Sequence, residues 1–189
     1  MIRKLVTIPD QRLRQKSLRI TRVTPKVEKL AQDMIDTTLD WDHDSEYGAA
    51  LAAIQIGETI KLTVVRNNFE DGKDQTFLTF INPEIVQKSR DFVVDVEGCL
   101  SVPGYYAKIP RANKIKVKAL TLEGEEVRLT LEGFPARVFQ HEIDHMHGKL
   151  FIDIIKDAST LLKLDDDGQL ISVDEIPQEI IDAQNHHQH

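Results

Sequence analysis

Residues 138–148, VFQHEIDHMHG, predict a helix that carries metal-binding chemistry. They contain the pattern H-E-x-x-H, with His141 and His145 four positions apart and Glu142 next to the first histidine. Residues four apart share one face of a helix, so both imidazoles can reach the same metal ion. Glu142 lies one step round the helix, where it can exchange protons with a water near that ion without being a ligand. The alternative is a surface helix that carries two histidines by chance.

A catalytic metal site needs a third protein ligand and an open position for water. Asp144 directly precedes His145, and we expect its carboxylate to orient an imidazole from outside the ligand set. His147 lies about 200° round the helix from His145, so we do not expect it to be a ligand. The third ligand must therefore come from another part of the chain, as a carboxylate, a histidine or the single thiol.

Two kinds of zinc peptidase share the H-E-x-x-H helix, and neither finds its third ligand here. One kind uses a glutamate on a following helix, but the carboxylates downstream, Asp153, Asp157 and residues 165–167, are not set in a clear second helix. The other kind has a third histidine after H-E-x-x-H-x-x-G-x-x. Gly148 matches the glycine of that motif, but position 151 is a phenylalanine.

The single cysteine is the remaining candidate. Cys99 stands in VEGCLSVPG at the end of a predicted strand, and Gly98 before it has no side chain, which lets the backbone pass close to a metal. The alternative is a small buried hydrophobic residue, the commonest fate of a lone cysteine. Two histidines and a thiolate suit a borderline-soft cation such as zinc.

The composition is that of a globular domain and excludes some functions. The 189 residues are 41% hydrophobic and 29% charged, with a formal net charge of −7, so no basic face for nucleic acid is expected. No apolar run is long enough for a signal peptide or a transmembrane helix, so no membrane association is expected. One cysteine excludes an internal disulfide and fits a reducing compartment, so we expect a cytoplasmic protein.

Hydrophobic patterning predicts an α+β fold, with antiparallel sheets packed around the central H-E-x-x-H helix. An amphipathic helix is predicted over 24–42, with Thr24 capping its free amides and Pro25 in its first turn. Strands are predicted over 60–66, 76–82 and 91–98, and a hairpin with one solvated face over 114–120 and 125–131. The metal-binding helix follows these strands, with Pro135 in its first turn and Gly148 just past its end.

The chain divides into a catalytic domain at residues 1–156 and an acidic extension at residues 157–189. The extension is predicted to be a short helix from about Asp174 to Ala183 or to be disordered. Whether such a helix packs on the body of the protein or stays free is left open by the sequence.

Three motifs, in order along the chain, resemble those of the peptide deformylases, the metal-dependent enzymes that remove the N-formyl group from new bacterial proteins. EGCLS at 97–101 and HEIDH at 141–145 are two of them, and GAALAAIQ at 48–55 is similar to the family motif G-x-G-x-A-A-x-Q. Further likeness lies in IPDQRLR (8–14), VPGYYAKIPRA (102–112) and KLFIDII (149–155), so the resemblance covers about residues 1–156.

The resemblance implies a mechanism and a set of site residues. Cys99, His141 and His145 would hold one divalent metal per chain, typically Fe(II), with zinc, nickel or cobalt able to replace it. Glu142 would move the proton during hydrolysis. The Gln55 side chain and the Leu100 N–H would stabilise the negative charge on the formyl oxygen.

Other residues are expected to bind the substrate or to support the site. The substrate-binding residues would be Gly48, Ala50, Glu97, Gly98, Phe134 and Val138, and the supporting residues would be Arg111 and Asp144. The resemblance makes Glu97 and Arg111 an ion pair that steadies the cysteine loop. Phe134 and Val138, at helical spacing before His141, could equally belong to the core.

One position departs from the family motif, because Ala50 stands where the second glycine is expected. A glycine there could serve a positive φ, a close approach of the substrate, or neither. Strain at Ala50 would reduce stability or activity, whereas a small loss of room would only alter the fit of substrates or inhibitors. With the other two motifs intact, we favour an active enzyme.

The expected substrates are N-formylmethionyl polypeptides, and contact with the ribosome is left open. Two other functions compete with this one. A zinc endopeptidase would cleave internal peptide bonds but would leave EGCLS and GAALAAIQ unexplained. A binding module would keep the metal and release no formate.

Overall fold

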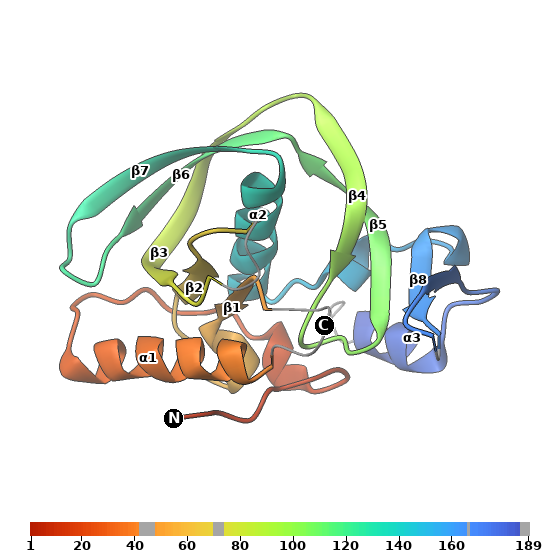
Figure 1. Ribbon diagram of the computed structural model, residues 1–189, viewed down its shortest axis with the longest axis horizontal. Helices are drawn as coiled ribbons and strands as arrows, with labels where there is room; N and C mark the ends of the chain where they lie inside the picture. Colours follow the sequence, from red (N-terminus) through yellow and green to blue (C-terminus); the bar gives the residue numbers. More distant parts are fainter. Residues whose placement is uncertain (42–47, 70–73, 166, 186–189) are drawn as a thin grey trace.

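Two antiparallel sheets enclose a central helix, α2 (Phe134–Met146), in this computed structural model (Figure 1). The structure describes residues 1–41, 48–69, 74–165 and 167–185. The five-stranded sheet has the order β1-β2-β3-β6-β7, formed by Ala50–Ala52, Leu62–Arg66, Phe77–Lys88, Lys114–Leu120 and Glu126–Glu132. The four-stranded sheet has the order β4-β5-β8-β9, formed by Phe92–Gly98, Tyr105–Ala112, Leu161–Leu164 and Leu170–Ser172. The predicted α+β fold is confirmed.

Further helices complete the description. Helix α1 spans Pro25–Asp40 and helix α3 spans Gln178–Asn185. Short 3₁₀ helices lie at Gln11–Arg14 (η1), Ala53–Ile56 (η2), Phe151–Ile154 (η3) and Ala158–Thr160 (η4). Among the described residues, no helix is both long enough and apolar enough to cross a bilayer.

Helices α1 and α2 pack on opposite faces of the five-stranded sheet, because side chains alternate between the two faces along each strand. Ala50, Val65 and Phe80 belong to the core cluster that contains residues of α2. Their chain neighbours Leu51, Val64 and Ile81 belong to the cluster that contains residues of α1. Because successive strand residues point to opposite faces, β2 is covered on both sides and is buried throughout. The strand β1 is thereby held between the two helices, beside the metal-binding helix.

The helix ends follow the predicted signals with one correction. Pro25 and Pro135 lie in the first turns of α1 and α2, as expected. The hydroxyl of Thr24 makes no capping hydrogen bond. Its carbonyl oxygen instead accepts from the N–H of Val27 at 2.8 Å and of Glu28 at 3.1 Å, so the backbone begins the helix without help from the side chain.

The predicted strands correspond to β2, β3, β4, β6 and β7, and the hairpin turns at Gly124. The sequence pattern did not predict β5, which contains Pro110. Proline is tolerated in a strand where its missing N–H faces no partner. The recorded pairing of β5 with β8 covers only residues 105–107, so Pro110 lies in the part of β5 that is paired with β4 alone.

Residues 161–164 and 178–185, in the acidic extension, pack on the body of the protein. Strand β8 pairs with β5, and helix α3 buries Ile180 and Ala183 in the cluster that contains Leu13 and Phe151. The helix lies a few residues later than the predicted 174–183. The described part of the extension thus supplies two strands of the four-stranded sheet, β8 and β9, and adds helix α3 to the core beside it (Figure 1).

Gly148 ends helix α2 in a position that no other residue fits. Its φ is +71°, and an added Cβ would lie 2.3 Å from the carbonyl oxygen of Arg14. Arg14 itself is fixed by two hydrogen bonds of 2.8 Å to Asp153. We therefore expect Gly148→Ala to lower the free energy of unfolding by about 2–5 kcal/mol, from backbone strain and the collision together.

Urea denaturation measures this loss, and Gly124→Ala is the matched control. Gly124 has a φ of +81° but no heavy atom within 4 Å of an added Cβ, so it tests backbone strain alone. The control should lose only about 1 kcal/mol. Equal losses in the two variants would contradict the role of the Arg14 contact.

Candidate metal centre

Three candidate ligand atoms from two parts of the chain meet at one point. The Nε2 atoms of His141 and His145 are 3.1 Å apart, and the Sγ of Cys99 is 3.2 Å from the Nε2 of His145. All three atoms lie within 4.8 Å of one another. In a tetrahedral site with bonds of about 2.1 Å to nitrogen and about 2.3 Å to sulfur, ligand atoms stand about 3.5 Å apart. The three residues therefore fit a single metal ion, which is the ligand set that the family resemblance implied.

Glu97 orients the imidazole of His141. Its Oε2 lies 3.1 Å from the Nδ1 of His141, which leaves Nε2 free to face the other two ligands. This corrects the role expected for Asp144, whose Oδ2 accepts a hydrogen bond from Arg111 at 2.5 Å instead. Adjacent helix positions differ by about 100°, so the carboxylate next to His145 is turned away from the ligand face.

Glu97 is the centre of a buried network of charges. Arg111 donates to both carboxylate oxygens, at 2.8 and 3.0 Å, and Arg137 donates to Oε1 at 2.8 Å. Burial alone would raise the pKa of Glu97, but hydrogen bonds from His141 and Arg111 outweigh burial and hold this pKa well below its usual range. The carboxylate therefore stays ionised. The ion pair between Glu97 and Arg111 is present as expected.

Arg137 is a member of this network that the sequence analysis missed. Besides Glu97, its guanidinium donates to the carbonyl oxygens of Ile109 at 2.8 Å and Val93 at 2.7 Å. It thus joins α2 to both β4 and β5. One sequence feature could have predicted its place in the site. Arg137 lies four residues before His141, on the same helix face as this candidate ligand.

The ring of His145 is held in the form that a ligand requires. Burial is the largest of the causes that lower the pKa of His145 well below its usual value. A neutral imidazole offers a lone pair to a cation, whereas a protonated one does not. His147 is not part of this group, because its Nδ1 lies 2.8 Å from the carbonyl oxygen of Ile143.

Glu142 is a buried carboxylate that shares a hydrogen bond with the side chain of Thr63. Glu142 is 4% exposed, and its Oε2 has no hydrogen-bond partner among the described residues. Burial raises the pKa of Glu142 to about 7. A carboxylate that is poised near neutrality and faces a cavity can take up and release a proton at working pH.

Gln55 is held so that its amide nitrogen faces the ligands. Its Oε1 accepts from the N–H of Ala52 at 2.8 Å, and its Nε2 lies 3.2 Å from the Oγ of Ser101 and 3.6 Å from the Sγ of Cys99. Gln55 is buried, with 2% of its surface exposed. Ser101, also missed by the sequence analysis, anchors it from the cysteine loop.

The Leu100 N–H belongs to the same turn. The turn is closed by a 2.9 Å hydrogen bond from the Val102 N–H to the Cys99 carbonyl oxygen. Among the described residues, the N–H of Leu100 has no recorded backbone partner. It is therefore available to a bound group next to Cys99.

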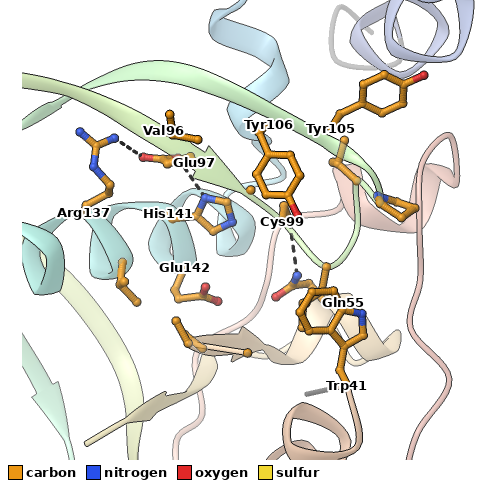
Figure 2. Close-up of a pocket in the computed structure, with 18 of the residues that line it drawn as sticks. Trp41, Gln55, Val96, Glu97, Cys99, Tyr105, Tyr106, Arg137, His141 and Glu142 are labelled. Carbon is orange, nitrogen blue, oxygen red and sulfur yellow. Dashed lines mark hydrogen bonds and ion pairs between the residues drawn. The ribbon is translucent and has the colours of Figure 1, made fainter. Parts of the chain in front are cut away.

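These groups surround one cavity of about 390 Å³ (Figure 2). Figure 2 shows His141, Glu142, Gln55 and Cys99 converging on it. All six predicted substrate-binding residues line it, namely Gly48, Ala50, Glu97, Gly98, Phe134 and Val138. The predicted supporting residues Arg111 and Asp144 are not part of its lining and lie behind the ligands.

Two glycines of the lining also make room for neighbouring parts of the fold. A Cβ on Gly98 would lie 2.5 Å from the ring of Tyr106, so this glycine makes room for the tyrosine on the paired strand. A Cβ on Gly48 would lie 2.4 Å from the methyl group of Thr38, so Gly48 lets the chain pass close to α1.

Ala50 is accommodated without strain. It lies in β1, paired with Val65, and its φ is not positive. Its methyl group packs in the core cluster beside α2 and borders the cavity. The replacement of the family glycine therefore changes the shape of the cavity wall and does not distort the backbone, which is the milder of the two expected outcomes.

A helix with two histidines and a buried glutamate, a thiolate from the neighbouring loop and an open cavity together define a metal-dependent hydrolase. The family model of the polypeptide deformylases matches residues 2–160. A peptide deformylase of Thermomicrobium roseum is 46% identical over 169 residues, which are 88% of this chain and 93% of the relative. One of Afipia carboxidovorans is 41% identical over 154 residues, which are 82% of this chain and 86% of the relative.

Solved structures agree with these sequence matches. The crystal structure of a peptide deformylase from Legionella pneumophila has a TM-score of 0.75 and 40% identity, covering 82% of this chain and 87% of that one. That of an Ehrlichia chaffeensis peptide deformylase in complex with actinonin has a TM-score of 0.75 and 35% identity, covering 82% and 89%. The chain belongs to the polypeptide deformylase family, the metal-dependent hydrolases that remove the N-formyl group from nascent polypeptides.

Proposed function

We propose that this chain hydrolyses the formamide of N-formylmethionyl polypeptides, with Cys99, His141 and His145 as ligands of one divalent metal. The observation that carries this proposal is that three candidate ligand atoms and a buried carboxylate with one unpaired oxygen face one cavity. The reaction breaks the bond between the formyl carbon and the methionine nitrogen and forms a bond from that carbon to a water oxygen. Its products are formate and a free amino group.

The metal, when bound, supplies Lewis acidity that lowers the pKa of water and polarises the carbonyl group. Glu142 accepts the proton of the attacking water and delivers it to the departing amine. One oxygen of this carboxylate, Oε2, has no hydrogen-bond partner among the described residues, which supports this role. General acid–base catalysis of this kind is typically worth about a hundred- to ten-thousand-fold in rate.

The Gln55 amide and the Leu100 N–H stabilise the negative charge that develops on the formyl oxygen. Their support is geometric, because the amide oxygen of Gln55 is occupied by Ala52 and its NH₂ group is turned toward Cys99. A donor that is held in place before the reaction begins needs no reorganisation during it. Ser101 holds the Gln55 amide from the other side.

The methionine side chain occupies the apolar part of the cavity near Phe134 and Val138. Both residues line the cavity, and Phe134 is 46% exposed although it begins a helix whose next turns are buried. Ala50 borders the same space and narrows it by one methyl group compared with the family glycine. Glu97 and Gly98 form the edge along which the peptide backbone passes.

We propose Fe(II) as the native metal, with zinc, nickel or cobalt able to replace it. Two imidazoles and a thiolate suit any of these cations, so the donor set supports this group of metals without selecting one. The substrates are new polypeptides, and the proposed location is therefore the cytoplasm, where such chains emerge from the ribosome.

The test is release of formate from formyl-Met-Ala-Ser, with the protein loaded with Fe(II) in the absence of air. We expect formate and free Met-Ala-Ser as products, and no product from acetyl-Met-Ala-Ser, which lacks the formyl group. Cleavage at an internal peptide bond would instead identify an endopeptidase. A loaded protein that releases nothing would be a binding module, and the proposal would be wrong.

A further inference from the structure

Strand β2 places a hydroxyl group on the face of the sheet that supports helix α2. Leu62 and Val64 pack in the core cluster that contains residues of α1, whereas Val65 packs in the one that contains residues of α2. Because side chains alternate along a strand, Thr63 points to the same face as Val65, toward α2. Thr63 is fully buried. A hydroxyl buried among apolar side chains is stable only with a hydrogen-bond partner.

The Thr63 hydroxyl has both a backbone carbonyl and the carboxylate of Glu142 as acceptors. Its Oγ is 3.0 Å from the carbonyl oxygen of Leu51, on the neighbouring strand β1. Burial is the largest influence on the pKa of Glu142 and raises it, whereas a hydrogen bond from Thr63 acts in the opposite direction and favours the ionised form. The hydroxyl has one hydrogen, and an ionised carboxylate is a stronger acceptor for it than a carbonyl oxygen. Thr63 therefore donates to Glu142 when the carboxylate is charged.

This bond is the contact that can hold the Glu142 side chain in one orientation. Glutamate turns about three single bonds, so the carboxylate at its end stays in place only if another group holds it. Among the described residues, no other side chain donates a recorded hydrogen bond to this carboxylate, and its Oε2 has no partner. Glu142 also lines the cavity. Thr63 thus holds the carboxylate from the side of the sheet, while its free acceptor positions remain open to a water in the cavity.

We propose that Thr63 is a positioning residue for the hydrolysis, whose hydroxyl keeps the Glu142 carboxylate in the orientation from which it exchanges a proton with the attacking water. Thr63 is not part of the cavity lining, so it acts through Glu142 and not on the substrate. Small displacements of a reacting group can cost as much as about a hundredfold in rate. This inference rests on the proposed function and adds a residue to its mechanism.

The first variant is Thr63→Val, which keeps the shape of the side chain and removes the hydroxyl. With Fe(II)-loaded protein and formyl-Met-Ala-Ser, we expect kcat to fall by about tenfold, the value of one hydrogen bond to a charged group. KM should stay within about twofold of the wild type, because the lost bond acts while bonds change and not when the peptide binds. Metal content should be unchanged, since Thr63 is not among the three candidate ligands.

A second pair of variants tests the hydroxyl alone. Thr63→Ser keeps the hydroxyl and Thr63→Ala lacks it, so the serine variant should have a kcat about tenfold above that of the alanine variant. This pair also decides the matter if Thr63→Val does not fold, as judged by circular dichroism. In crystal structures, the Glu142 carboxylate should keep its wild-type orientation in Thr63→Ser and turn away from it in Thr63→Val.

A double variant shows whether Thr63 acts through Glu142. In a Glu142→Ala background the hydroxyl has no carboxylate to hold, so adding Thr63→Val should change the residual rate by less than about twofold. A purely structural role of Thr63 would lower the rate in both backgrounds alike.

The matched control is Thr37→Val, which removes a buried hydroxyl on α1. Thr37 donates to the carbonyl oxygen of Asp33 at 2.7 Å and accepts from the N–H of Arg3 at 2.8 Å, and it is not part of the lining of the catalytic cavity. The variant loses hydrogen bonds of a similar kind, so its stability should fall while its kcat stays within about twofold of the wild type.

Three results would overturn the inference. They are a kcat of Thr63→Val, or of Thr63→Ala relative to Thr63→Ser, that is unchanged, a raised KM at constant kcat, and an equal loss of rate in the Glu142→Ala background. Each leaves the proposed function standing if the wild type releases formate. Failure of the wild type to release formate counts against the proposed function itself.

Discussion

Glu142→Ala is expected to keep its metal and to lose formate release by about a hundred- to ten-thousand-fold. The carboxylate is not among the three converging ligand atoms, so its removal leaves those atoms in place. What disappears is the group that carries the proton from water to the leaving amine. The loss should fall on kcat, because Glu142 acts while bonds change and not when the peptide binds.

The measurement pairs formate release from formyl-Met-Ala-Ser with metal content. Glu142→Gln provides a version of the same size that cannot accept a proton as a carboxylate does, and it should be equally inactive. Glu84→Ala, at an exposed position on β3, is the control and should retain full activity. A Glu142→Ala protein that turns over at the wild-type rate would remove Glu142 from the mechanism.

Cys99→Ser is expected to weaken metal binding by more than about a hundredfold, since even a residue that only supports a ligand costs about ten- to a hundredfold when lost. The thiolate is one of three ligand atoms, and a serine hydroxyl is a harder, mostly protonated donor at neutral pH. Loss of activity should follow the loss of metal and should be partly reversed at high metal concentration.

Metal analysis after dialysis against a chelator measures this affinity directly. His147→Ala is the control on the same helix turn, because His147 is bonded to the carbonyl oxygen of Ile143 and lies outside the ligand group. That variant should retain its metal. Full occupancy of Cys99→Ser, with unchanged affinity, would mean that the third ligand is another group.

Local patterns predicted the parts of this protein that depend on neighbours in the chain. Three features follow from rules that span a few residues: Pro135 and Gly148 at the two ends of α2, the hairpin around Gly124, and the two histidines on one helix face. The third proposed ligand was harder to predict, because Cys99 is distant in sequence from the two histidines. It was chosen by its setting and by family likeness.

Contacts between distant segments were beyond the reach of these patterns. Nothing in the sequence indicates that Glu97, and not the nearer Asp144, meets the ring of His141. The same holds for Arg137, whose partners lie on β4 and β5. The reason for Gly98 is the ring of Tyr106 across the strand pair, a contact set by register. Strand β5 was not predicted because it contains Pro110, and proline usually argues against a strand.

The two proposed histidine ligands lie on a helix packed against the five-stranded sheet, and the third ligand follows β4 of the other sheet. A cation bound by all three would therefore cross-link helix α2 and its five-stranded sheet to the four-stranded sheet. A free metal concentration a thousand times the dissociation constant adds about 4 kcal/mol to the stability of the native state. A chain without the ion would separate more readily between the two sheets and would be exposed to proteases. Metal supply in the cell would then set the lifetime of the protein as well as its activity.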